Sequence, residues 1–490
     1  MGFSFYQTHR NQKIREEQEK TMAEQAANPK QEQETLSLAD TVAQTDTTAV
    51  KETKSPAQVF SNPQVSNEDD YVVETDKAIY RFGKKGGCLK SAILKDVYRY
   101  TPKGETKQPL ELFADGTNEM SIGLMLRDQT EISTKDCYFI SDTEDTLKVD
   151  GKNNTLILRL YPNYKGEAVE CGMLDNASYI EYAYSFSNED YRFGFKIRFV
   201  NMEDYLYANK HDYTLVWNAQ PECVEKNYEY EKNITSVYYM DNVNEVDNLD
   251  ERKDDKKDFT SPLKWVSFKQ QFFTTCLIVD DEPFQSGTLS VNVPDKSEQS
   301  VLKNCNAELD FEIKDLNKGD FGMSMYVGPN QYKLLKTYGM KLERQVPLGW
   351  GFFLLHWVNR FVIIPVFNWL EAYGLSYGLI ILILTIFIKI VVLPVSYKTY
   401  MSSAKMRALK PEIEAINARY PKDEDMMKKQ QATMNLYRSA GVSPAGGCVP
   451  MLLQMPILIA MYRFFPAAYE LRQQSFLWAE DLSTYDSIWE

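Results

Sequence analysis

From about residue 71 to residue 335, apolar and polar residues alternate with the two-residue period of a β-strand. The stretch YRFGFKIRF shows this pattern with apolar side chains at Tyr191, Phe193, Phe195, Ile197 and Phe199. Similar runs recur along the region, and turn signals such as VDGKNN and NED separate them. Little helical pattern lies between the runs. The region therefore predicts a large antiparallel β-sandwich over residues 71–335.

Beyond residue 345 the spacing becomes helical and the chain becomes more apolar. Residues 346–372 have aromatic and aliphatic side chains at helical spacing, but polar residues interrupt them, which predicts an amphipathic helix in a membrane interface. Residues 374–395 are apolar apart from Lys389. At about 1.5 Å per residue they can cross a hydrocarbon core about 30 Å thick, so we predict a transmembrane helix. A second apolar run, residues 446–468, predicts a return across the membrane before a final segment, residues 469–490.

The segment between the two predicted spans, residues 396–440, is polar and rich in lysine and arginine. Pro421 and the acidic cluster that follows it mark a turn, so we expect a helical hairpin. A short basic loop stays on the cytoplasmic side of a membrane. The sandwich, which is one span away, must then lie outside the cytoplasm.

The first seventy residues differ from both regions. Residues 1–6, MGFSFY, are too short to cross a bilayer, so either the chain starts there or it begins partway through a span. Residues 7–70 are rich in Gln, Glu, Thr, Asn, Ala and Ser. Such a segment buries too little apolar surface to offset the entropy lost on ordering, which predicts a flexible linker.

The composition argues against several classes of function. The 490 residues carry a net charge of −14, which is unfavourable for a nucleic-acid-binding body. The seven cysteines form no CxxC pair and there are only three histidines, so neither a metal cage nor histidine-based catalysis is expected. The sequence has no GxxxxGK[ST] loop, and no motif singles out a pair of carboxylates. We therefore expect no enzyme activity, no metal and no cofactor.

The last hundred residues contain specific motifs. PAGGCVPMLLQMPI runs from Pro444 to Ile457, and ELRQQSFLWAEDLS follows at residues 470–483. With SSAKMRALKPEIEAI, residues 402–416, these stretches resemble the YidC family of membrane protein insertases. Shorter similarities extend the resemblance back to about residue 70, in YVGPNQYKLLKTYG (326–339), KWVSFKQQFF (264–273) and AIYRFGKKGGCLKSAILKD (78–96).

The resemblance implies a multi-pass protein of the bacterial inner membrane, with a large periplasmic sandwich and five core spans around a hydrophilic groove. In the family, a cation of the first core span lies in that groove, and Lys389 occupies the matching place, where arginine is common. Gln454 is a candidate for hydrating the groove, although a structural hydrogen bond is an equal alternative. The resemblance also implies a docking role of the hairpin for a ribosome, a signal recognition receptor or a substrate, with Met406, Arg407 and Lys410 as the matched positions. A solvated basic face is the simpler alternative for these cations.

Two interpretations of Lys389 follow from the residues themselves. Its ammonium group either reaches the cytoplasmic end of the helix near Val395, about 9 Å away, or faces a water-filled cavity. The implied partners are newly made membrane proteins, the Sec translocon and the lipid bilayer, with no direct contact to nucleic acid.

The whole chain also has a competing interpretation, as a membrane-anchored β-sandwich that binds carbohydrate or forms an envelope scaffold. Under the family interpretation, only two of the five core spans are present. We therefore expect a fragment of a longer protein that lacks the last three spans, with residues 1–6 as the remnant of an N-terminal span.

Overall fold

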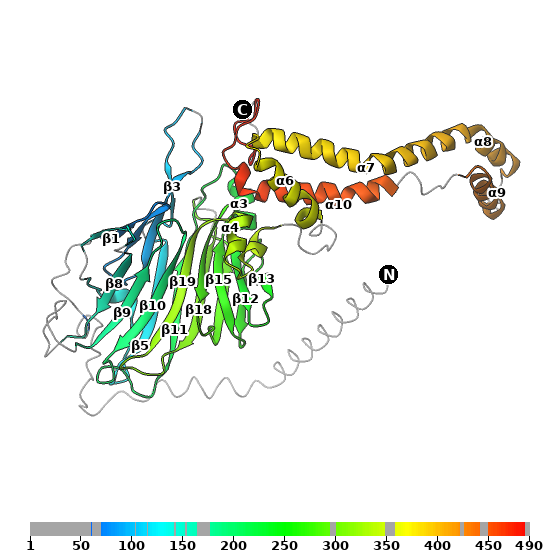
Figure 1. Ribbon diagram of the computed structural model, residues 1–490. Helices are drawn as coiled ribbons and strands as arrows, with labels where there is room; N and C mark the ends of the chain where they lie inside the picture. Colours follow the sequence, from blue (N-terminus) through cyan, green and yellow to red (C-terminus); the bar gives the residue numbers. More distant parts are fainter. Residues whose placement is uncertain are drawn as a thin grey trace, which may run out of the picture. The chain divides into compact units, whose positions relative to one another are not determined.

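A computed structural model describes eleven parts of the chain (Figure 1). They are residues 60, 70–102, 104–114, 116–141, 144–151, 154–163, 177–294, 300–347, 358–421, 426–441 and 449–485. The predicted span remnant, residues 1–6, and the predicted linker up to residue 69 lie outside these parts, apart from Phe60. The beginning of the predicted interfacial helix, residues 348–357, also lies outside them.

The alternating region folds into three β-sheets, and the largest has eight strands. These are β8 (Thr155–Leu160), β9 (Tyr179–Ser185), β10 (Arg192–Val200), β12 (Ser236–Asp241), β13 (Val246–Asn248), β15 (Leu263–Lys269), β16 (Phe273–Val279) and β19 (Asp320–Pro329). Their order across the sheet is β13-β12-β15-β16-β19-β10-β9-β8. All ladders between them are antiparallel.

The second sheet contains β5 (Asn118–Met125), β6 (Glu131–Ser133), β11 (Asp212–Ala219), β14 (Asp255–Phe259), β17 (Ser286–Asn292) and β18 (Asn304–Glu312), in the order β14-β17-β18-β11-β5-β6. The third contains β1 (Tyr71–Glu74), β2 (Ala78–Phe82), β3 (Leu89–Tyr98), β4 (Pro109–Leu112) and β7 (Thr146–Lys148), in the order β4-β3-β2-β1-β7. Among the strands that the structure describes, β1 and β7 form the one parallel pair.

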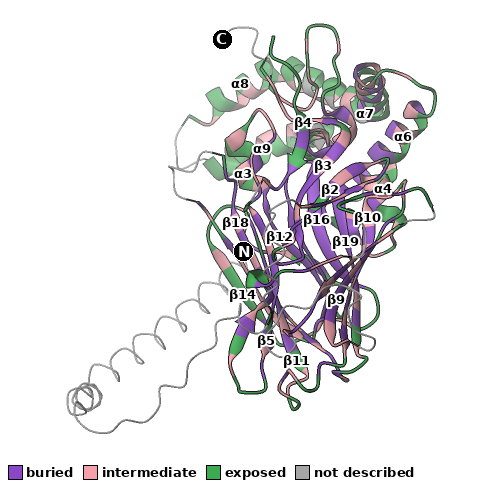
Figure 2. Cartoon of the chain, turned by 90° about the vertical axis from the view of Figure 1, so that its left-hand side faces the viewer, coloured by how far each residue is buried: buried purple, intermediate pink, exposed green. Residues whose placement is uncertain are grey.

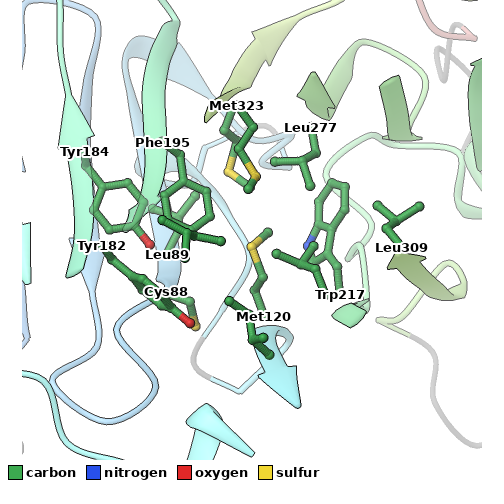
Figure 3. Packing of buried hydrophobic residues seen from close by; sticks show 14 of the residues in the cluster. Cys88, Leu89, Met120, Tyr182, Tyr184, Phe195, Trp217, Leu277, Leu309 and Met323 are labelled. Carbon is green, nitrogen blue, oxygen red and sulfur yellow. The ribbon is translucent and has the colours of Figure 1, made fainter. Parts of the chain in front are cut away.

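The apolar faces of the sheets meet in a shared core (Figure 3). In β10 the residues Phe193, Phe195, Ile197 and Phe199 are buried while their neighbours are half-buried, as the alternation predicts. The ring centroids of Trp217 in β11 and Phe268 in β15 lie 3.9 Å apart, so the two larger sheets pack face to face. The expected antiparallel sandwich is confirmed. Its aromatic core explains why Tyr and Phe are frequent in this region.

The rest of the described chain is mainly helical. A short helix, α3 (Tyr228–Ile234), interrupts the strands, and α4 (Tyr332–Thr337) follows the last one. Then come a π-helical turn (Asn359–Ile363), α6 (Ile364–Glu371), α7 (Tyr377–Ala408), α8 (Lys410–Arg419), α9 (Met426–Ser439) and α10 (Val449–Phe464). Figure 2 shows that exposed and half-buried residues cover α8 and α9, and neither helix has a buried residue.

One helix in the described parts, α7, is long and apolar enough to cross a membrane, over Tyr377–Pro394. It does not end near residue 395, where the sequence turns polar, but continues to Ala408. The polar part contains no glycine or proline, so nothing in it stops the helix. Pro394 lies inside α7, where its ring is accommodated at the end of the apolar stretch. The predicted span and the first part of the predicted hairpin are therefore one continuous helix.

Candidate functional site

Helices α6 and α10 cover one side of α7. Ile380, Leu384, Ile388 and Val392 recur every four residues along α7, and all four are buried. They belong to a cluster with Phe367 and Leu370 of α6 and Ala460 and Phe464 of α10. A hydrogen bond also joins the π-helical turn to α10: Nδ2 of Asn359 donates to the backbone oxygen of Ala460 over 3.1 Å. Within the described parts of the chain, the opposite side of α7, which includes Leu382, Ile386 and Ile390, stays uncovered.

Lys389 lies on that uncovered surface. Its side chain is exposed, and no carboxylate pairs with it in the parts of the chain that the structure describes. The large apolar residues Leu382, Ile386, Ile390 and Leu393 of the same helix are exposed as well. An apolar helix surface of this kind requires lipid or further helices to cover it. Lys389 is thus a lone charge in a surface that is otherwise suited to a membrane interior.

Gln454 and the hairpin residues lie apart from Lys389. Gln454 is half-buried on α10, and no hydrogen bond joins it to Lys389 in the described structure. Met406 and Arg407 are in the last turn of α7 and Lys410 is the first residue of α8. The two cations are exposed and have no acidic partner among the described residues, whereas Met406 is half-buried. The role of each of these residues remains a prediction.

A buried ion pair connects the segment after α10 with the sandwich. Nε of Arg472 donates a hydrogen bond to Oε1 of Glu225 over 2.6 Å, and Nη2 donates to the backbone oxygen of Tyr98 over 2.6 Å. The side chains of Arg472 and Glu225 are only 4% and 8% exposed. The guanidinium carbon also lies 5.1 Å from the ring centroid of Phe273, within the range of a cation–π contact.

A second buried carboxyl group, that of Glu231 in α3, lies next to this pair. Its Oε2 accepts hydrogen bonds from the backbone N–H groups of Val224 and Glu225, each over 3.1 Å. Burial raises the pKa of Glu231 to about 7. Burial acts on the pKa of Glu225 in the same upward direction, while the charge and the hydrogen bond of Arg472 lower it and favour the ionised carboxylate of the pair. Glu231 is therefore the carboxyl group at this junction that binds a proton more readily than an exposed one.

Further contacts surround the ion pair. Nε2 of Gln271 donates to the backbone oxygen of Pro466 over 3.0 Å, and Nε2 of Gln473 donates to that of Tyr98 over 2.7 Å. The rings of Phe273 and Tyr469 meet edge to face, with centroids 5.9 Å apart. Sequence reasoning assigned no role to Arg472, although the ELR motif contains it. The sequence feature that could have pointed to Arg472 is its place in the ELR motif, directly before the QQSFLW stretch.

Two family descriptions match the chain. The one described as "YidC periplasmic domain" matches residues 70–360, and the one described as "60Kd inner membrane protein" matches residues 369–489. A curated relative named "Membrane protein insertase YidC", from Bacteroides fragilis strain YCH46, is 38% identical over 438 residues, covering 88% of this chain and 66% of that protein. A relative of the same name from Porphyromonas gingivalis strain ATCC 33277 is 38% identical over 433 residues, covering 86% of this chain and 64% of that protein.

One similar solved structure is described as "Active YidC insertase crystal structure with the first transmembrane domain resolved". It is 19% identical, has a TM-score of 0.26, and the match covers 86% of this chain and 77% of that one. The chain spans about two thirds of the length of the curated relatives above, which are 66% and 64% covered.

Proposed function

Because the chain belongs to the YidC family of membrane protein insertases, we propose that it inserts newly made proteins into the bacterial inner membrane. The observation that carries the proposal is the position of Lys389 on the uncovered side of α7. A charge near the middle of a span costs about 2.5–3.5 kcal/mol on insertion scales when it faces lipid. Water or a partner on that side of the helix avoids this cost, so a hydrated groove along Lys389 fits the exposed cation.

In this mechanism Lys389 acts as a point charge. Its ammonium group attracts acidic residues in the part of a substrate that is moving outward, while water in the groove shortens the apolar barrier. Lysine lacks the planar fork with which arginine holds a carboxylate through two hydrogen bonds, so attraction rather than paired capture is the expected contribution. Since the sequence contains no P-loop, the driving force comes from apolar partitioning, translation and the membrane potential. The potential contributes about 2.3 kcal/mol per charge per 100 mV.

The membrane arrangement follows from α7. With α7 as a span, the exposed cations Arg407 and Lys410 lie on the cytoplasmic side and the sandwich lies in the periplasm. We place the return crossing at α10, with Gln454 beside the groove, which makes the protein multi-pass. The cations at the turn between α7 and α8 are then available to a ribosome or to the receptor of the signal recognition particle. Action beside the Sec translocon is part of the same proposal.

The test uses the full-length protein in cells depleted of their own insertase. The measured quantity is insertion of a single-span substrate with an acidic external tail, for Lys389, Lys389→Arg and Lys389→Leu at matched protein levels. The proposed role of Lys389 as a cation in the groove is supported if Lys389→Arg retains insertion and Lys389→Leu reduces it at least tenfold. Equal insertion by Lys389→Leu would refute a role for the charge. Deleting residues 71–335 distinguishes this function from the competing one. An insertase should largely retain its activity, whereas a carbohydrate-binding or scaffold protein depends on the sandwich.

A further inference from the structure

The loop that follows Arg472 ends in a tight turn with two large apolar side chains. The backbone N–H of Phe476 donates to the oxygen of Ala479 over 2.9 Å, and the N–H of Ala479 donates back over 3.0 Å. These two bonds close a turn whose central residues are Leu477 and Trp478. Leu477 is 76% exposed and Trp478 is 70% exposed. We call these two residues the apolar tip.

Polar contacts hold the base of the loop. Oδ1 of Asp481 accepts hydrogen bonds from the backbone N–H groups of Gln473 over 3.0 Å and Ser483 over 2.8 Å, and from the Ser483 hydroxyl over 2.7 Å. The N–H of Leu482 donates to the backbone oxygen of Gln474 over 2.9 Å. The turn is therefore built by backbone and carboxylate contacts, and burial of the apolar tip is not needed to form it.

The backbone at Leu477 is unfavourable for a leucine. Its φ angle is +55°, in the left-handed region that glycine and asparagine adopt most readily. Turns that require a positive φ normally contain one of those residues. A leucine at this position adds strain without improving the turn, so its exposed side chain has to supply the compensating advantage.

The ring of Phe476 fixes the loop at the outer end of α7. A methyl group on Gly378, the second residue of α7, would overlap this ring, so the two are in direct contact. The apolar stretch of α7 begins at Tyr377. The apolar tip therefore lies beside the level at which α7 enters the hydrocarbon. Trp369 and Tyr373, in the segment leading into α7, are also exposed, and Trp and Tyr are the residues that collect at this depth of a membrane.

We propose that Leu477 and Trp478 insert into the interfacial region of the periplasmic leaflet and anchor the loop to lipid. The inference rests on the proposed function, which makes α7 a membrane span. Residues 473–479, QQSFLWA, carry no charge, so the inserted end places no ion in the interface. A leucine and an indole on a rigid turn suit a lipid surface, which requires apolar area and an amphipathic ring but no matching shape.

The test places an environment-sensitive nitrobenzoxadiazole dye on a cysteine at the apolar tip, in the variant Trp478→Cys. The full-length protein is reconstituted into vesicles of phosphatidylethanolamine and phosphatidylglycerol, with and without lipids that carry a shallow spin-label quencher. Unsubstituted protein treated with the same dye provides the blank. The matched control is Val243→Cys, which is 74% exposed and follows β12. In the β12–β15 ladder, Ser236 pairs with Lys269 near the Gln271 contact and Asp241 pairs with Leu263 at the other end, so position 243 lies away from the membrane.

The proposal predicts that the lipid quencher reduces emission at position 478 at least threefold more than at position 243, and that aqueous iodide shows the reverse order. Equal quenching by iodide at both positions would place the tip in water and overturn the proposal. Protection of position 478 from both quenchers would mean that another part of the protein or a second copy covers the tip, which also overturns it. Release of the unsubstituted protein from the vesicles by alkaline carbonate would instead remove the proposed membrane placement on which the inference depends.

Discussion

Arg472 and Glu225 are 247 residues apart in the sequence, and their side chains meet as a hydrogen-bonded ion pair over 2.6 Å. Both side chains are buried, and the same guanidinium group donates to the backbone oxygen of Tyr98. The pair joins the segment after α10 to the sandwich through charges that are withdrawn from water. Either charge would be buried without a partner if the other were removed. We therefore expect the contacts at this junction to form and break together.

Replacement of Arg472 by methionine should destabilise the protein strongly. Breaking a buried pair leaves one charge unpaired, and the usual loss is about 3–5 kcal/mol. We expect a lower apparent melting temperature in detergent and faster proteolysis of the segment that follows α10. The matched control is Arg127→Met, which breaks the exposed pair between Arg127 and Asp204 and should cost about 1 kcal/mol or less. Equal effects of the two substitutions would contradict the assigned importance of the junction.

Stability should decrease as the pH rises through the range in which Glu231 ionises. Burial raises the pKa of Glu231 from 4.5 to about 7, so the folded protein binds a proton there that the unfolded chain releases above pH 4.5. The stabilisation is complete below that value and is lost as the pH rises through about 7. In Glu231→Gln the neutral amide oxygen can accept the same two backbone N–H groups. The melting temperature of Glu231→Gln should therefore fall less between pH 5 and pH 8 than that of the unsubstituted protein. Parallel curves for the two proteins would exclude this role for Glu231.

Leu477→Gly separates the strain at the turn from the function of its side chain. Glycine adopts a φ of +55° readily, so the substitution should leave thermal stability unchanged or raise it by about 1 kcal/mol. Lipid quenching of a dye at position 478, in the background of Trp478→Cys, should fall at the same time, because Leu477 is the remaining apolar side chain of the tip. Trp478→Ser serves as the comparison for stability, since it removes an exposed side chain without relieving the positive φ. A loss of several kcal/mol in Leu477→Gly would show that the leucine packs in the protein interior.

Gly378→Ala should displace the turn while leaving α7 helical. Alanine favours helix over glycine by about 1 kcal/mol, but its methyl group would overlap the ring of Phe476. We expect faster proteolysis of residues 473–483 and greater access of iodide to a dye at position 478. Adding Phe476→Ala should reverse the steric part of the effect. The control Gly123→Ala, which meets nothing within 4 Å, should leave the loop as it was. If proteolysis and iodide access are the same in Gly378→Ala as in the unsubstituted glycine background, the contact with Phe476 does not hold the loop against α7.

The sandwich was predictable because a two-residue period directly assigns side chains to a face, as Phe193 and Phe195 illustrate. Lys389 was recognisable for a related reason, since one charge in an apolar run breaks a clear pattern. The full extent of α7 was hidden, because a change from apolar to polar residues ends a span without ending a helix. Arg472 was hidden too. A charged residue in a polar stretch reads as surface, and only the folded chain brings it to Glu225.

The unbroken course of α7 also fixes a length. Lys389 and Arg407 lie on one helix, which separates them along its axis by about 27 Å at 1.5 Å per residue. An extended chain covers about 3.3–3.6 Å per residue, so about eight residues bridge that distance. Under the proposed function, a nascent chain held at Arg407 would have to expose at least that many residues before its leading end met the ammonium group of Lys389. The length of α7 would then set how much of a substrate must be synthesised before an acidic residue first meets that charge.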